Sequence, residues 1–109
     1  MALDATDPDL PRGLVEAIVH VESRGNTLAS NACCSGLMQV ARRYSRWPSW
    51  ALHIPAIGRA EGVRILRRWR RRCGGDLECA LRAYATGNRA LRDPQHGRPY
   101  AVAVLRRVR

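Results

Sequence analysis

The chain has 109 residues, 46% hydrophobic and 26% charged, a composition that indicates one globular domain over residues 1–109 and excludes a disordered or low-complexity chain. Nineteen arginines and no lysine give a formal charge of +10, which predicts a surface that attracts polyanions. No apolar run reaches the length of a membrane span, and the acidic start MALDATDPDLPRG is unlike a signal peptide.

The first predicted helix carries a glutamate on its apolar face. Asp9 and Pro11 are residue types of a helix cap and first turn, and Gly25 favours an end to the helix. Between them, residues at i, i+3, i+4 and i+7 spacing share one face: Leu14, Val15, Ile18, Val19 and Glu22. We therefore expect Glu22 in the last turn, facing the interior.

The middle of the chain is harder to assign. Residues 26–36 are predicted to form a loop, and the apolar segment from Leu37 to Val40 could open another helix. Prolines break residues 44–58, which we expect to be irregular. A helix from about Ala60 should bury Val63, Leu66 and Trp69 among arginines and end at Cys73-Gly74-Gly75.

Two shorter helices are predicted in the last third. Asp76 has the residue type of an N-cap, and a buried stripe follows it: Leu77, Ala80, Leu81 and Tyr84. The last helix, Tyr100 to Val108, should bury Ala101, Val104, Leu105 and Val108. No segment alternates with period two for long enough to predict a strand, so the fold class is all-α.

Glu22 is the first candidate for chemistry. A carboxyl group on a buried helical face loses hydration, so its pKa rises and it can hold the proton that a general acid needs near neutral pH. The alternative is a surface glutamate, which would follow if the helix ended one turn earlier.

Four segments occur in the order found in one enzyme family: Glu22-Ser23, Gly36-Leu37-Met38-Gln39, Ala83-Tyr84-x-x-Gly87 and Pro99-Tyr100. Together they resemble the soluble lytic transglycosylases, which have a lysozyme-like fold that is also similar to goose-type lysozymes. The resemblance covers residues 10–108 and implies a single lysozyme-like domain that cleaves peptidoglycan glycan strands without a cofactor.

The resemblance also implies residue roles. Glu22 matches the catalytic acid/base, and Ser23 the residue that orients it. Met38 and Gln39 match the segment lining the glycan cleft, while Tyr84 and Tyr100 match tyrosines of the site. Ordinary core packing is the alternative for both tyrosines.

One position departs from the family pattern. Ala85 stands where the family has asparagine, and alanine cannot make the asparagine's hydrogen bonds. Thr86 or Asn88 could take over the contact. The departure keeps a non-catalytic basic module, binding cell wall or nucleic acid, open as a function.

The resemblance implies a reaction with one acid. Glu22 would protonate the glycosidic oxygen between N-acetylmuramic acid and N-acetylglucosamine and then take the proton of the sugar's own 6-hydroxyl, leaving a 1,6-anhydro end. A second carboxylate would allow hydrolysis instead, as in a goose-type lysozyme. None of the candidates lies on a family-matched segment: Glu61, Asp76, Glu78 and Asp93.

The four cysteines predict disulfides. A bond between adjacent Cys33 and Cys34 would be strained, so we favour a bridge from that pair to Cys73 or Cys79. Zinc binding and four free thiols are the alternatives. The histidines have no ligand spacing, so we expect no metal site at His20, His53 or His96.

Partners and location follow from charge and from the implied substrate. The arginines from Arg64 to Arg72 favour anionic wall polymers over specific nucleic-acid binding, since no nucleic-acid motif is present. We expect a monomeric domain that acts in the periplasm or cell wall. Without a signal peptide, delivery by a phage virion, with contacts to virion or tail components, by a holin-type lesion, or as part of a longer exported chain is expected.

Overall fold

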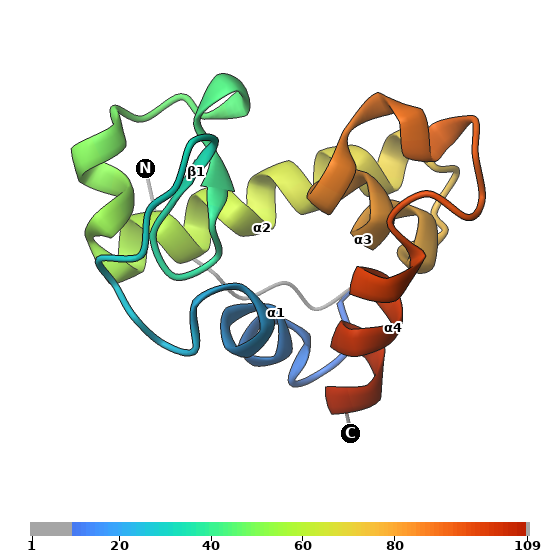
Figure 1. The fold of residues 1–109 in the computed structure, drawn as a ribbon, viewed down its shortest axis with the longest axis horizontal. Helices are drawn as coiled ribbons and strands as arrows, with labels where there is room; N and C mark the ends of the chain where they lie inside the picture. The colour runs from blue at the N-terminus through green and yellow to red at the C-terminus, as the bar shows by residue number, and fades with distance from the viewer. Residues whose placement is uncertain (1–9, 109) are drawn as a thin grey trace.

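The computed structural model describes residues 10–108, and four α-helices make up about half of them (Figure 1). They are α1 (Leu14–Ser23), α2 (Pro55–Arg72), α3 (Leu77–Thr86) and α4 (Arg98–Arg107). Two-residue strands β1 (Cys34–Ser35) and β2 (Val40–Ala41) form a small hairpin. Three 3-10 helices complete the order: η1 (Arg42–Tyr44), η2 (Ser49–His53) and η3 (Asn88–Leu91). The mostly helical architecture agrees with the predicted all-α fold class, and the small hairpin was not predicted.

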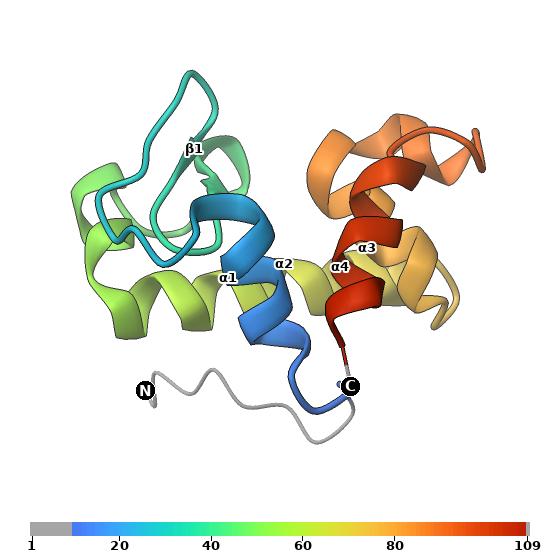
Figure 2. The same ribbon diagram turned by 60° about the horizontal axis from the view of Figure 1, so that its bottom comes forward.

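The long helix α2 connects the two halves of the molecule. Its N-terminal half packs against η2 and the hairpin, and its C-terminal half packs against α3 (Figure 1). Helix α4 contacts both α3 and α1, and the turned view shows α1 and α4 side by side (Figure 2). The core lies where these helices meet, with Leu14, Ile18, Leu66, Leu81 and Val104 fully buried. Among residues 10–108, no helix is long and apolar enough to cross a membrane.

Helix α1 places Glu22 as predicted but starts later than predicted. Gly13, with φ of 86°, is the N-cap, and Pro11 lies before the helix and not in its first turn. The predicted cap Asp9 lies outside the described residues. Arg24, with φ of 54°, ends the helix by donating its backbone N–H to the carbonyls of Val19 and His20. Glu22 is therefore in the last turn.

The segment from Leu37 to Val40 does not open a helix, so that prediction is wrong. Residues 36–39 form the turn between β1 and β2, in the register Cys34 with Ala41 and Ser35 with Val40. Gly36 (φ 85°) and Gln39 (φ 44°) both adopt left-handed backbone, which reverses the chain where a helix would have continued.

Helix α2 begins at Pro55, five residues before the predicted start. Proline fits the first helical position because its fixed φ suits a helix and its missing N–H would have no partner there. Gly62 lets the hairpin turn approach, because a Cβ atom there would lie 2.5 Å from Sδ of Met38. The buried face holds Val63, Leu66 and Trp69, as predicted.

The last two helices follow the predictions with small differences. Asp76 caps α3, since its Oδ1 accepts the backbone N–H of Cys79 at 3.1 Å. Helix α4 starts at Arg98, two residues before the prediction. Its buried residues are Ala101 and Val104, whereas Leu105 is 37% exposed, so its predicted burial is wrong.

The cysteines pair within their own neighbourhoods, Cys33 with Cys34 and Cys73 with Cys79, and none is free. The predicted bridge between the two pairs is wrong. The hairpin that follows Cys33 packs beside Gly62, while Cys73 lies eleven residues further along the chain, about 16 Å along a helix axis. That separation is several times the usual Cβ to Cβ distance of a disulfide, about 4 Å.

Candidate active site

Glu22 is a half-buried carboxyl group in the last turn of α1. Burial raises its pKa from 4.5 to about 7, and only the nearby Tyr100 hydroxyl opposes this rise by favouring the charged form. No arginine within residues 10–108 forms an ion pair with it. The group can therefore carry a proton near neutral pH and also lose it, as an acid that later acts as a base must.

Tyr100, near the start of α4, lies beside Glu22. Its hydroxyl is buried and forms no hydrogen bond of ordinary geometry within the described part of the chain. It nevertheless lies close enough to Glu22 to lower the pKa of that carboxyl group. Burial, then the Glu22 carboxylate and Tyr84, raise the pKa of Tyr100 far above its usual range. The hydroxyl therefore stays protonated and is available as a donor.

Tyr84 joins α3 to the hairpin turn. Its hydroxyl donates to the backbone carbonyl of Met38 at 2.8 Å, a contact between residues 46 apart in sequence. Burial, followed by the charges of Glu22 and Glu61, raises the pKa of Tyr84 well above its usual value. The site thus gathers Glu22, Tyr84 and Tyr100 from α1, α3 and α4.

Ser23 fixes the end of α1 against the same turn. Its Oγ donates to the Leu37 carbonyl at 2.7 Å, lies 3.2 Å from the Val19 carbonyl and accepts the Gly25 N–H at 3.2 Å. Because Ser23 follows Glu22 directly, these bonds hold the backbone that carries the acid. This placement suits the orienting role that the resemblance implies.

Met38 and Gln39 organise the turn from inside. Met38 is fully buried and its carbonyl accepts from Tyr84, so this residue shapes the turn from within. Gln39 is 8% exposed; its Nε2 donates to the carbonyls of Ala29 and Gly36 at 2.9 and 3.0 Å, and its Oε1 accepts from Asn31 at 3.0 Å. Contact of either residue with substrate stays a prediction.

The segment after Tyr84 shows which side chain could replace the family asparagine. Ala85 is exposed in the last turn of α3. Thr86 already uses its hydroxyl, which donates to the Arg82 carbonyl at 2.7 Å. Asn88 is exposed, and its amide has no hydrogen bond within the described residues. Of Thr86 and Asn88, Asn88 is therefore the one whose polar side chain is not already hydrogen-bonded within the described residues.

The other candidate carboxylates are engaged elsewhere. Asp76 caps α3, Glu78 pairs with Arg82, and Asp93 accepts the Gln95 N–H at 3.0 Å with Arg89 4.0 Å away. Glu61, 1% exposed, is bound by two arginines. Residues 10–108 contain no group of three histidine, cysteine or acidic side chains placed to hold a metal ion.

The role of Glu61 was missed by the sequence analysis. Its carboxylate accepts from Arg64 at 2.8 and 2.9 Å and from the backbone N–H of Arg46 at 2.7 Å, while Arg64 also donates to the Tyr44 carbonyl at 3.0 Å. Glu61 therefore anchors η1 to α2. A signal was available, because Glu61 shares a helical face with Ile57 and Ile65, four residues away on either side.

Among the comparisons with known proteins, one found a match. A family model described as the transglycosylase SLT domain matches residues 4–101, nearly the whole chain. Searches of curated proteins and of solved structures gave no match. This family implies lytic transglycosylase-type cleavage of peptidoglycan. The match covers all four motifs, from Glu22-Ser23 to Pro99-Tyr100, and the chain therefore belongs to the transglycosylase SLT domain family.

Proposed function

We propose that this protein is a peptidoglycan lytic transglycosylase in which Glu22 is the single acid/base. The observation that carries the proposal is the raised pKa of Glu22, about 7, in a group with no cationic partner among the described residues. Such a carboxyl group is protonated in a large fraction of molecules at neutral pH and can donate to a leaving oxygen.

During the reaction, Glu22 gives one proton to the substrate and takes one proton back from it. Glu22 donates its proton to the glycosidic oxygen between N-acetylmuramic acid and N-acetylglucosamine as the bond from that oxygen to C1 breaks. The 6-hydroxyl of the muramic acid then bonds to C1 and gives its proton to the Glu22 carboxylate. A 1,6-anhydro ring forms, no water is consumed, and Glu22 is restored.

The engagement of the other carboxylates supports this reaction over hydrolysis. A hydrolytic enzyme positions a second carboxylate to activate water or to act as a nucleophile. Here Glu61, Asp76, Glu78 and Asp93 serve ion pairs, a helix cap and a turn. The 6-hydroxyl is already tethered to the reacting sugar, which gives it the advantage of proximity over free water.

The test is the mass of the products. Digested peptidoglycan should give muropeptides lighter by one water than the products of a hydrolytic lysozyme. Glu22→Gln should lower the rate roughly 100- to 10,000-fold, because a positioned general acid contributes about that much. Hydrated reducing-end products would favour the goose-type lysozyme. Equal clearing of walls by the native protein and Glu22→Gln would rule out Glu22 as the acid, and no clearing by the native protein would leave a binding module as the function.

We also propose that the protein acts where this substrate lies, in the periplasm or cell wall. The formal charge of +10 supports this location, because anionic wall polymers attract a basic surface. Binding to purified walls should weaken as salt rises, since exposed charges are screened beyond about 8 Å at physiological ionic strength.

A further inference from the structure

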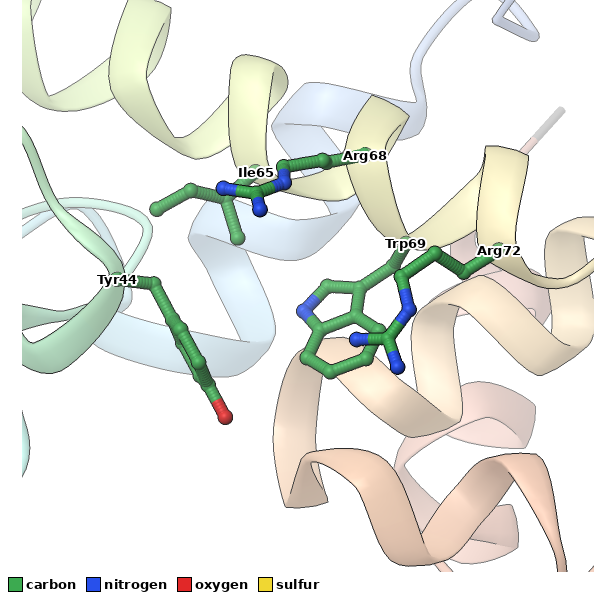
Figure 3. A pocket seen from close by; sticks show the side chains of 5 residues that line it. All are labelled: Tyr44, Ile65, Arg68, Trp69 and Arg72. Carbon is green, nitrogen blue, oxygen red and sulfur yellow. The ribbon is translucent and has the colours of Figure 1, made fainter.

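A small pocket lies on the C-terminal half of α2, outside the cluster around Glu22. Figure 3 shows its lining: Tyr44 from η1 faces Trp69, and Arg68 and Arg72 extend from α2 above Ile65 and Trp69. Ile65 and Trp69 are both at most 4% exposed and form an apolar floor, while both arginines are exposed. The pocket therefore combines a buried aromatic surface with a cationic rim.

The wall of the pocket is fixed before any ligand binds. The rings of Tyr44 and Trp69 meet edge to face, with centroids 5.7 Å apart and planes at 89°. The Tyr44 carbonyl is held by Arg64, which is held in turn by the buried carboxylate of Glu61. A preformed wall lowers the entropy that a ligand must lose with the protein on binding.

The two rim arginines have no acidic partner within residues 10–108. Arg68 and Arg72 stand four residues apart on one helical face, where like charges repel. The Arg72 guanidinium lies 5.0 Å from the centroid of the Trp69 ring. The buried Glu61 cannot neutralise them because Arg64 and Arg46 already occupy it. An anion between the two guanidinium groups would relieve their repulsion.

The size of the pocket limits the ligand. Its volume is about 70 Å³, room for a few water molecules, since one water needs roughly 10–15 Å³. This space suits a carboxylate with its neighbouring carbon atoms, and it is too small for a disaccharide. The apolar floor favours a short aliphatic group beside the charge.

The pocket also adjoins the candidate site. A Cβ atom placed on Gly87 would lie 3.6 Å from the Tyr44 hydroxyl, and Gly87 follows Tyr84 by three residues at the end of α3. A polymer that passes Tyr84 therefore comes within reach of the wall of the pocket.

We propose that this pocket binds a carboxylate of the peptide stem that peptidoglycan glycan strands carry. This inference rests on the proposed function, since it takes peptidoglycan as the ligand. Arg68 and Arg72 hold the carboxylate by charge-assisted hydrogen bonds, and Trp69 packs against the carbon atoms next to it. The enzyme thereby prefers strands with peptide stems to bare glycan.

The test measures binding in a Glu22→Gln background, which removes cleavage from the readout. Intact walls are compared with walls whose stem carboxylates have been converted to amides, because removing the stems with an amidase would leave a lactyl carboxylate on each muramic acid. Intact material should bind at least about fivefold more tightly, as a charge-assisted contact partly screened by water allows. Adding Arg68→Gln and Arg72→Gln should abolish this preference. The control pair Arg71→Gln and Arg106→Gln removes the same charge from exposed positions outside the pocket and should keep it.

Three results would overturn the inference. They are equal binding of intact and amidated walls, an equal loss of preference in the pocket and control pairs, and a larger loss of affinity for duplex DNA than for walls in the pocket pair. Melting curves show whether both pairs fold. A separate digest with native Glu22 tests the proposed function: no muropeptide release with a retained stem preference would refute catalysis alone.

Discussion

Glu22 and Glu61 are both shielded from water, but their pKa values shift in opposite directions. At Glu22, burial is opposed only by the Tyr100 hydroxyl, and the pKa rises to about 7. At Glu61, burial also favours the neutral form, but hydrogen bonds from Arg64 and the Arg46 backbone, with the charges of both arginines, lower the pKa below its usual value. Near neutral pH, one carboxyl group can exchange a proton, and the other is held in its charged form.

The residues around a buried glutamate therefore decide whether it holds structure together or exchanges a proton. A buried charge with full hydrogen bonding holds structure together, and removing one partner leaves the others unpaired. A buried carboxyl group without a cation gains little from ionisation, so its proton is available for chemistry. Burial alone would have predicted a raised pKa for both Glu22 and Glu61, and the two arginines reverse the shift at Glu61.

The largest effect on stability should come from breaking the Glu61 cluster. Glu61→Ala should lower the free energy of unfolding at pH 7 by about 3–5 kcal/mol, because it leaves Arg64 partly buried without its anion. Urea unfolding measures this loss. Replacing Glu61 and Arg64 together by methionine should recover much of it, since no unpaired charge is then left in the core.

The pH dependence of this loss has a definite sign. The folded-state pKa of Glu61 is lowered from 4.5, so its contribution is present above that pH and is lost as pH falls through the folded-state pKa. The gap between native protein and Glu61→Ala should therefore shrink in acid. A gap below about 1 kcal/mol at pH 7, as an exposed pair would give, would contradict the cluster's structural role.

Glu22 should behave in the opposite way. Its folded-state pKa is raised from 4.5 to about 7, so stability is greatest below pH 4.5 and falls as pH rises to about 7. Glu22→Gln should be close to native protein at pH 4 and more stable by about 2 kcal/mol at pH 8, a value reduced for partial exposure. Urea unfolding at pH 4, 6 and 8 checks this. A destabilised Gln variant at pH 8 would mean that the charge is stabilised in the fold.

The smallest effect concerns how Tyr100 tunes the acid. Its hydroxyl lowers the pKa of Glu22, so Tyr100→Phe should raise that pKa and move the alkaline fall of activity to higher pH. Rates on soluble glycan fragments across pH 5 to 9 report the shift. Tyr84→Phe is the control: it should cost about 1 kcal/mol of stability by freeing the Met38 carbonyl, without moving the profile. A shift in Tyr84→Phe alone would reverse the two roles.

The sequence predicted those parts that depend on helical periodicity. The apolar stripe of α1 placed Glu22 correctly, and Asp76 marked the start of α3. The hairpin turn was missed because its strands have two residues each and because Gln39, a residue that rarely adopts positive φ, does so here. Leu105 was assigned to the core from spacing alone, which does not show whether a neighbour covers that face.

Contacts between distant segments could not be predicted from local patterns. The anchoring of η1 by Glu61 uses the backbone N–H of Arg46, which every residue type except proline offers. The cysteine pairing depended on how far α2 separates the hairpin from the turn before α3. The site residues that the resemblance suggested were brought near Glu22 by α3 and α4, an arrangement that spacing alone does not give.

In the two hydrogen bonds that hold the hairpin turn, the donor residues and the acceptor residues differ in how they tolerate mutation. Ser23 and Tyr84 supply side-chain donors, but the acceptors are the main-chain carbonyls of Leu37 and Met38. Every amino acid carries that carbonyl, so substitutions at positions 37 and 38 keep both acceptors as long as the side chain fits the core. Substitutions at positions 23 and 84 delete a donor outright. In a deep mutational scan, positions 37 and 38 should therefore accept apolar replacements, while positions 23 and 84 should be restricted to hydroxyl-bearing residues.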